Sequence, residues 1–136
     1  MKRRASLVLV LVVAILCMGM GGLGGQPQGT IPETDVNIQA EVEDRGGVVT
    51  TLEKFSMAGK TSLDALRGHG KLTIPFKNID TVVFGENKGD AVMVDVKLKT
   101  GETMMLRVRS RAQFYGSTGF GAFQIKSKDL ALINFP

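Results

Sequence analysis

Apolar and polar residues alternate over two neighbouring segments of this 136-residue chain, residues 92–98 and 104–109. A period of two is the side-chain period of a β-strand that buries one face. Between them, Lys99-Thr100-Gly101 fits a three-residue hairpin loop with glycine in the left-handed conformation. Such a loop sets Val96 opposite Met104, Val94 opposite Leu106 and Val92 opposite Val108. The sequence therefore predicts an antiparallel pair whose inward residues face one another.

The same period recurs elsewhere, between turn-forming residues. We expect a hairpin of residues 36–43 and 48–57, and short strands at 72–76, 81–84, 122–125 and 131–135. Pro75 has no amide hydrogen to donate, so it should lie at a sheet edge or a bulge. Residues 61–68 instead favour a single helical turn, with Ser62 as its cap and Gly68 at its end. Together these patterns predict an all-β fold, a small antiparallel barrel or sandwich of about eight strands.

Two segments of the chain resemble each other at an offset of 51 positions, residues 70–84 and residues 121–135. The apolar spacing matches, and four residue types are identical, namely those of Gly70, Ile74, Lys77 and Phe84. Upstream, residues 59–61 line up with residues 116–118 if the first copy carries an extra loop around residues 64–69. We therefore expect two duplicated four-stranded halves, about residues 35–84 and 90–135. A coincidence of β periodicity is the alternative.

The N-terminus has the pattern of a secretory signal. Lys2, Arg3 and Arg4 precede an apolar run over residues 7–18 and a glycine-rich stretch over residues 19–25. We expect an apolar leader helix and signal peptide at residues 1–25, a linker at 26–34 and a single β domain at 35–136. Cleavage near Gly24, retention as a membrane anchor and lipid attachment at Cys17 are the three alternatives. Each predicts export to the periplasm or cell surface, with membrane contact only through residues 1–25 if they are retained.

The composition excludes several classes of function. Cys17 is the only cysteine, so a chain without its leader has no thiol for a disulfide, a metal or catalysis. Loss of Lys2, Arg3 and Arg4 would lower the 17 Lys and Arg residues to 14, against 13 Asp and Glu residues. That near balance argues against a nucleic-acid partner. With His69 as the single histidine, we expect no metal site and no cofactor.

Basic and methionine side chains share the expected outer face of the hairpin. They are Lys97, Lys99, Arg107, Arg109, Met93 and Met105. This face would suit a protein partner or an anionic envelope component. An ordinary solvated sheet face, partly neutralised by Asp95 diagonal to Arg107, is the alternative.

Aromatic residues and glycines gather in residues 114–123. Phe114, Tyr115 and Phe120 could form an aromatic loop that stacks on sugars or peptides. In the alternative, the glycines allow the strand to bend and the phenylalanines fill the core.

Ser62, Asp64 and His69 have the chemistry of a nucleophile, an orienting carboxylate and a base. The three residues share one short polar segment, which we expect to be a solvated loop without fixed geometry. The sequence thus favours an exported envelope binding or assembly module without catalytic activity. A small periplasmic hydrolase using Ser62, Asp64 and His69, or a purely structural membrane-anchored envelope protein, are the alternatives.

Overall fold

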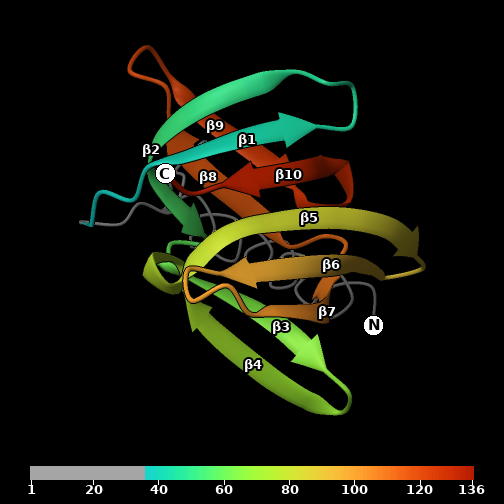
Figure 1. Ribbon diagram of the computed structural model, residues 1–136. Coiled ribbons are helices and arrows are strands. Elements are labelled where there is room, and N and C mark those ends of the chain that lie inside the picture. The colour runs from blue at the N-terminus through green and yellow to red at the C-terminus, as the bar shows by residue number, and fades with distance from the viewer. Residues whose placement is uncertain (1–35) are drawn as a thin grey trace, which may run out of the picture. The chain divides into compact units, whose positions relative to one another are not determined.

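The computed structural model describes residues 36–136, which form ten β-strands and two 3₁₀ turns (Figure 1). In chain order the strands are β1 (Ala40–Asp44), β2 (Val49–Met57), β3 (Ser62–Arg67), β4 (Gly70–Pro75), β5 (Ile79–Lys88), β6 (Ala91–Leu98), β7 (Thr103–Arg109), β8 (Gln113–Ser117), β9 (Ala122–Lys126) and β10 (Leu130–Asn134). The 3₁₀ turns are η1 (Phe76–Asn78) and η2 (Ser127–Asp129). The all-β class is confirmed, with ten strands where eight were expected.

One antiparallel sheet contains all ten strands of residues 36–136, in the order β4-β3-β7-β6-β5-β10-β1-β2-β8-β9. The sheet curls into a half-barrel and stays open, with β4 and β9 as its two edges (Figure 1). The fold is therefore a single curled sheet, whereas the sequence left a barrel and a sandwich as alternatives. Pro75 ends the edge strand β4, as predicted from the absence of an amide hydrogen in proline.

The predicted hairpin is present as β6 and β7. Its register joins Val96 to Met104, Val94 to Leu106 and Val92 to Val108, as the loop length required. Gly101 has a φ of 96°, the left-handed conformation that glycine adopts without a steric penalty. Val92, Val94, Val96 and Val108 are fully buried, so the alternation of the sequence does correspond to one buried face.

A cluster of phenylalanine rings fills the core. Phe55 lies at its centre, with ring centroids 5.3 Å from Phe76, 5.7 Å from Phe114 and 5.7 Å from Phe135. Phe84 meets Phe114 edge to face at 6.2 Å. Offset and edge-to-face ring pairs contribute about 0.5–1.5 kcal/mol beyond the area that they bury. The rings come from strands and turns that are distant in the chain, so this cluster joins the two halves of the sheet.

The two extra strands correct two predictions. Residues 62–67 form β3, so the predicted helical turn at residues 61–68 is wrong. Leu63 is fully buried but Leu66 only partly, because the strand alternation places them on opposite faces. Likewise, residues 113–117 form β8 and are not a loop.

If β1 is exchanged with β6, β2 with β7, and so on to β5 with β10, every strand keeps the same neighbours in the sheet. An offset of 51 positions relates η1 to η2 and the first residues of β3 and β5 to those of β8 and β10. The amide of Phe76 donates to the carbonyl of Thr61, and at the same offset the amide of Ser127 donates to that of Ala112. Gly68 and Gly119, again 51 positions apart, both have positive φ in the β3–β4 and β8–β9 turns. The strand order therefore has a symmetry that relates β1–β5 to β6–β10.

Parts of the predicted alignment differ from the structure. The supposed extra loop at residues 64–69 is most of β3 with its turn, so residues 59–61 do not correspond to residues 116–118. Gly116 instead lies within β8, where a Cβ atom would stand 2.8 Å from the Cβ of Leu52. Ile74 is buried whereas Ile125 is only half-buried, so this pair does not share one environment.

The signal peptide at 1–25, the linker at 26–34 and the lipid site at Cys17 lie outside the described residues. Among residues 36–136, no helix has the length and apolar character that crossing a bilayer requires.

Candidate functional site

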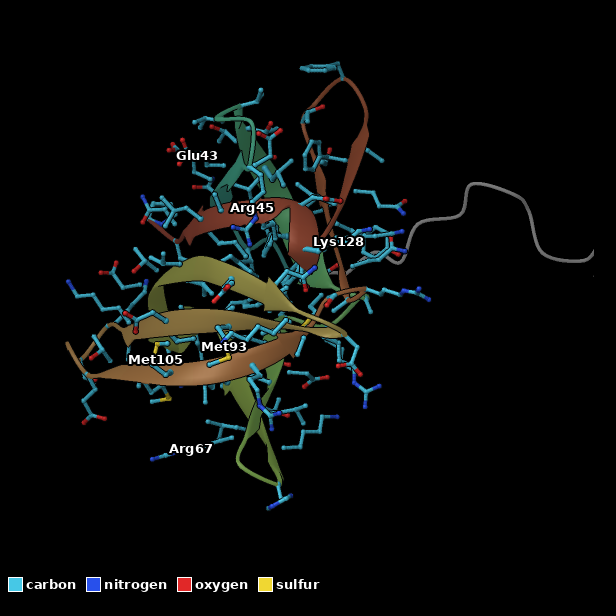
Figure 2. All side chains as sticks on the ribbon, turned by 90° about the vertical axis from the view of Figure 1, so that its right-hand side faces the viewer. Glu43, Arg45, Arg67, Met93, Met105 and Lys128 are labelled. Atoms are coloured by element: carbon cyan, nitrogen blue, oxygen red, sulfur yellow. The ribbon has the colours of Figure 1, made fainter. Side chains whose placement is uncertain are left out.

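The outer face of β6 and β7 carries most of the predicted basic and methionine side chains. Met93 lies opposite Arg107, Asp95 opposite Met105 and Ala91 opposite Arg109. Figure 2 shows Met93 and Met105 on the same side of the hairpin, and the Met105 side chain is 61 % exposed. Lys97 follows on β6, whereas Lys99 lies in the turn and lines a separate hollow with Lys77. The outer face of β6 and β7 thus carries the predicted basic and methionine residues except Lys99.

The charges on this face are only partly compensated. Arg107 donates from Nη2 to the carbonyl oxygen of Gly68 at 2.7 Å. Lys97 pairs with Asp80, with Nζ and Oδ2 3.9 Å apart. Within the described part of the chain, Arg109 makes no ion pair and no side-chain hydrogen bond. Arg109 therefore keeps its full donor capacity for a partner.

A groove opens beside these arginines, where β3 and β7 separate. In the described residues the two strands are paired at one position, Leu66 with Arg107. Beyond it they leave a hollow of about 260 Å³, which we call the seam groove. Its apolar lining comes from Met57, Ala65, Leu66 and Ala112. Its charged lining comes from Asp64, Lys71, Arg107 and Arg109.

Asp64 is neutralised by its neighbours within this groove. Its carboxylate accepts a hydrogen bond from Thr73 Oγ1 at 2.9 Å and lies 3.4 Å from Lys60 Nζ and 3.6 Å from Lys71 Nζ. Burial raises the pKa of Asp64, but the hydrogen bonds from Thr73 and Lys60 and the two lysine charges outweigh it, so the pKa lies below its ordinary value. Asp64 is therefore ionised at neutral pH and already paired. Arg107 and Arg109 remain as positive charge that nothing in the groove balances.

The backbone of Asp64 has an unusual partner. Its amide donates to the thioether sulfur of Met57 at 3.3 Å. Thioether sulfur is a weak acceptor, and the position is partly buried. In a continued ladder the amide would meet a strand carbonyl. The groove therefore contains a backbone donor with only a weak acceptor.

The corresponding place in the other half of the sheet is closed. There β2 and β8 pair at Glu53 with Ser117, pass a bulge, and pair again at Ser56 with Tyr115 and Met57 with Phe114. By the offset of 51, Ser117 corresponds to Leu66 and Tyr115 to Asp64, so Glu53 takes the place of Arg107. A curled sheet of this kind therefore requires neither an open groove between these two strands nor a basic residue beside it.

The proposed catalytic residues are not assembled. Ser62 and Asp64 lie on β3, whereas His69 is exposed in the turn between β3 and β4. Strand residues advance about 3.3 Å each, so the end of β3 at Arg67 lies about 10 Å from Asp64. The Asp64 carboxylate contacts Thr73, Lys60 and Lys71 and not the imidazole. No group of three potential metal ligands occurs in the described range.

Replacing His69 by alanine is expected to leave both stability and binding unchanged. The side chain is exposed in a turn, where substitutions usually change the free energy of unfolding by less than about 0.5 kcal/mol. A denaturant melt together with the binding assay described below measures both. A large loss of binding at normal stability would contradict the expectation that His69 has no functional role.

The predicted aromatic loop is divided between core and surface. Phe114 is fully buried on β8 and stacks on Phe55, whereas Tyr115 on the same strand is half-buried. Phe120 lies in the β8–β9 turn with 94 % of its surface exposed. The three residues therefore form no common surface.

A family model with the description "uncharacterised protein" matches residues 34–135. The chain belongs to this family. The match spans all ten strands, so the seam groove lies inside the region that defines the family. No curated protein matches the chain.

Of the residues that line the seam groove, sequence reasoning singled out Asp64, Arg107 and Arg109 and missed the others. Met57 was placed in a strand without a role, and Lys60 and Lys71 were not connected with Arg107. For Lys71 the signal was the alternation over residues 62–67, since β3 lies between β4 and β7 and pairs Leu66 with both Lys71 and Arg107.

Proposed function

We propose that this protein is an exported envelope module that binds or assembles without catalysis and engages an anionic partner through the seam groove. The observation that supports this most directly is the groove itself, with Arg107 and Arg109 beside an already neutralised Asp64. Arginine presents a planar fork of donors that matches carboxylate and phosphate groups.

The contrast between the two halves supports a dedicated site. At the position of Arg107 the other half carries Glu53, and its seam is closed by the resumed ladder. If the basic groove only served to maintain the sheet, the corresponding place would be expected to need the same charge. Partner binding accounts for the difference.

Titration with anionic probes tests the proposal. The exported protein is titrated at low ionic strength with a capped acidic peptide, inorganic polyphosphate and phosphatidylglycerol vesicles, and with a neutral counterpart of the peptide and vesicles. We expect saturable binding of an anionic probe, weakened about tenfold or more in the Arg107→Gln/Arg109→Gln variant. Surface ion pairs are screened by salt, so binding should also weaken as salt is added.

The matched control is Lys77→Gln/Lys128→Gln. It removes the same charge from the exposed turns η1 and η2 and should bind like the wild type. Lys128 contributes its carbonyl to the Arg45 side chain, near which Figure 2 places it, and this contact is unaffected. If no anionic probe distinguishes the two double variants, the proposal is wrong.

Export is the second element of the proposal. The cationic head and apolar run of residues 2–18 support removal of residues 1 to about 25. N-terminal sequencing of the protein from the cell envelope should find a first residue near Gly25. A protein beginning at Met1 would favour the anchor, and a lipid on Cys17 the lipoprotein alternative.

We also infer that the domain arose by internal duplication, with five strands in each half. The paired turns, the equivalent hydrogen bonds and the exchange symmetry of the strand order all support this origin. In the centre of the sheet Val82 pairs with Ile133, which stand 51 positions apart. A two-fold axis relating the halves would pass through this pair.

A further inference from the structure

We propose that the seam groove takes a short, extended acidic segment of a partner polypeptide, which pairs with β3 at Asp64. This inference rests on the proposed function and narrows its anionic partner to a peptide strand. Adding a strand to unpaired backbone groups is a recurrent mode of peptide recognition, in which main-chain bonds provide affinity and side-chain pockets provide specificity.

The first step of the argument is the unfinished ladder. Because Leu66 pairs with Arg107, a continued antiparallel ladder would set Asp64 opposite Arg109. The chain instead turns away after Arg109, whose carbonyl accepts from the amide of Ala112 at 3.1 Å. The space between Asp64 and Arg109 is therefore the place of a missing ladder position.

The second step concerns the amide of Asp64. Its acceptor is the Met57 sulfur. The carbonyl oxygen of a bound peptide would be a much stronger acceptor for this amide. In the other half Tyr115, the counterpart of Asp64, does face a strand residue, Ser56. A peptide carbonyl at Asp64 would thus complete the strand pairing of β3, as β2 completes the pairing of β8 in the other half.

The third step is the chemistry of the lining. Side chains of an extended segment alternate between two faces. One face would place acidic groups beside Lys71, Arg107 and Arg109, and the other would place apolar groups against Met57, Ala65 and Ala112. A segment of alternating acidic and apolar residues fits both.

The size of the groove limits the ligand. Its volume of about 260 Å³ is just below the range of about 300–1,000 Å³ that is usual for small-molecule pockets. The groove therefore has room for only a few residues of an extended segment. A phosphate polymer would satisfy the arginines but has no apolar side chains for the floor of the groove.

The test combines titration with hydrogen exchange. A short capped peptide of alternating valine and glutamate is titrated into the exported protein, and exchange of the Asp64 amide is followed by NMR. We expect saturable binding and slowing of that exchange by about tenfold or more in the complex. The Arg109→Gln variant should bind about tenfold more weakly, whereas Lys128→Gln should bind like the wild type.

A peptide with methylated backbone amides provides the decisive control. It keeps every charge and side chain but cannot lie in a ladder, so it should bind about tenfold more weakly or worse. Because this change is in the peptide, the result does not depend on the folding of a variant. Equal binding of both peptides, or unchanged exchange at Asp64 in the complex, would overturn the inference. Groove-dependent binding of polyphosphate without binding of the peptide would also overturn it, while leaving the proposed function intact.

Discussion

Replacing Phe55 by alanine is expected to destabilise the domain by about 3–5 kcal/mol. The side chain is fully buried, and its ring contacts those of Phe76, Phe114 and Phe135. Removing it leaves a cavity where three further rings lose a neighbour. Domains of this kind have a total stability of about 5–15 kcal/mol, so the loss is a large part of it. The midpoint of denaturant unfolding measures the effect.

Phe120→Ala is the matched control for this experiment. It makes the same chemical change at a side chain that is 94 % exposed in a turn. Its free energy of unfolding should stay within about 0.5 kcal/mol of the wild type. Equal midpoints for the two variants would show that the aromatic cluster does not hold the sheet together as described.

Phe84→Ala and Phe135→Ala are expected to destabilise by similar amounts, about 3–5 kcal/mol each. The two residues stand 51 positions apart, and each is 4 % exposed. Equal burial at corresponding places should give comparable cavities. By contrast, Ile74→Ala should cost more than Ile125→Ala, because only Ile74 is buried. Denaturant melts of the four variants provide the comparison.

Lys77→Ala and Lys128→Ala serve as exposed controls at corresponding turn positions. Each should change the free energy of unfolding by less than about 0.5 kcal/mol. If either Phe84→Ala or Phe135→Ala proved neutral, the likeness of the two halves would not extend to their energetics. Such a result would count against the inferred duplication and favour a coincidence of β periodicity at these positions.

The candidate site was only partly predictable. The period of two placed Met93, Met105, Arg107 and Arg109 on one outer face, because side-chain direction in a strand follows from position along the chain. The groove beside them was not predictable, because it depends on where β3 stops pairing with β7. The hydrogen-bond partner of Arg107 was not predictable for a related reason. The turn after β3 brings the Gly68 carbonyl within reach of that guanidinium, and this contact is invisible in the β6–β7 pattern.

Both missed strands, β3 and β8, occupy corresponding places in the two halves. In β3, Ser62 and the spacing of Leu63 and Leu66 imitate a capped helical turn. In β8, Gly116 and the aromatic residues imitate a loop. Each is short, and each becomes a strand because neighbours from distant parts of the chain pair with it. Local propensity is a weak guide where tertiary pairing supplies the hydrogen bonds.

The sequence by itself determined the all-β class, the β6–β7 register and the buried face of that hairpin, because alternation and turn length act over neighbouring residues. Only the tertiary structure decided the order of the ten strands, the open edges at β4 and β9, and the basic groove at Asp64 and Arg109. Pairings such as β2 with β8 and β3 with β7 join residues far apart in the chain. Many alternative partners share the same period of two, so the pattern alone does not select among them. The selection comes from packing, as where Gly116 allows β8 to approach Leu52 and the rings of Phe55 and Phe114 to stack.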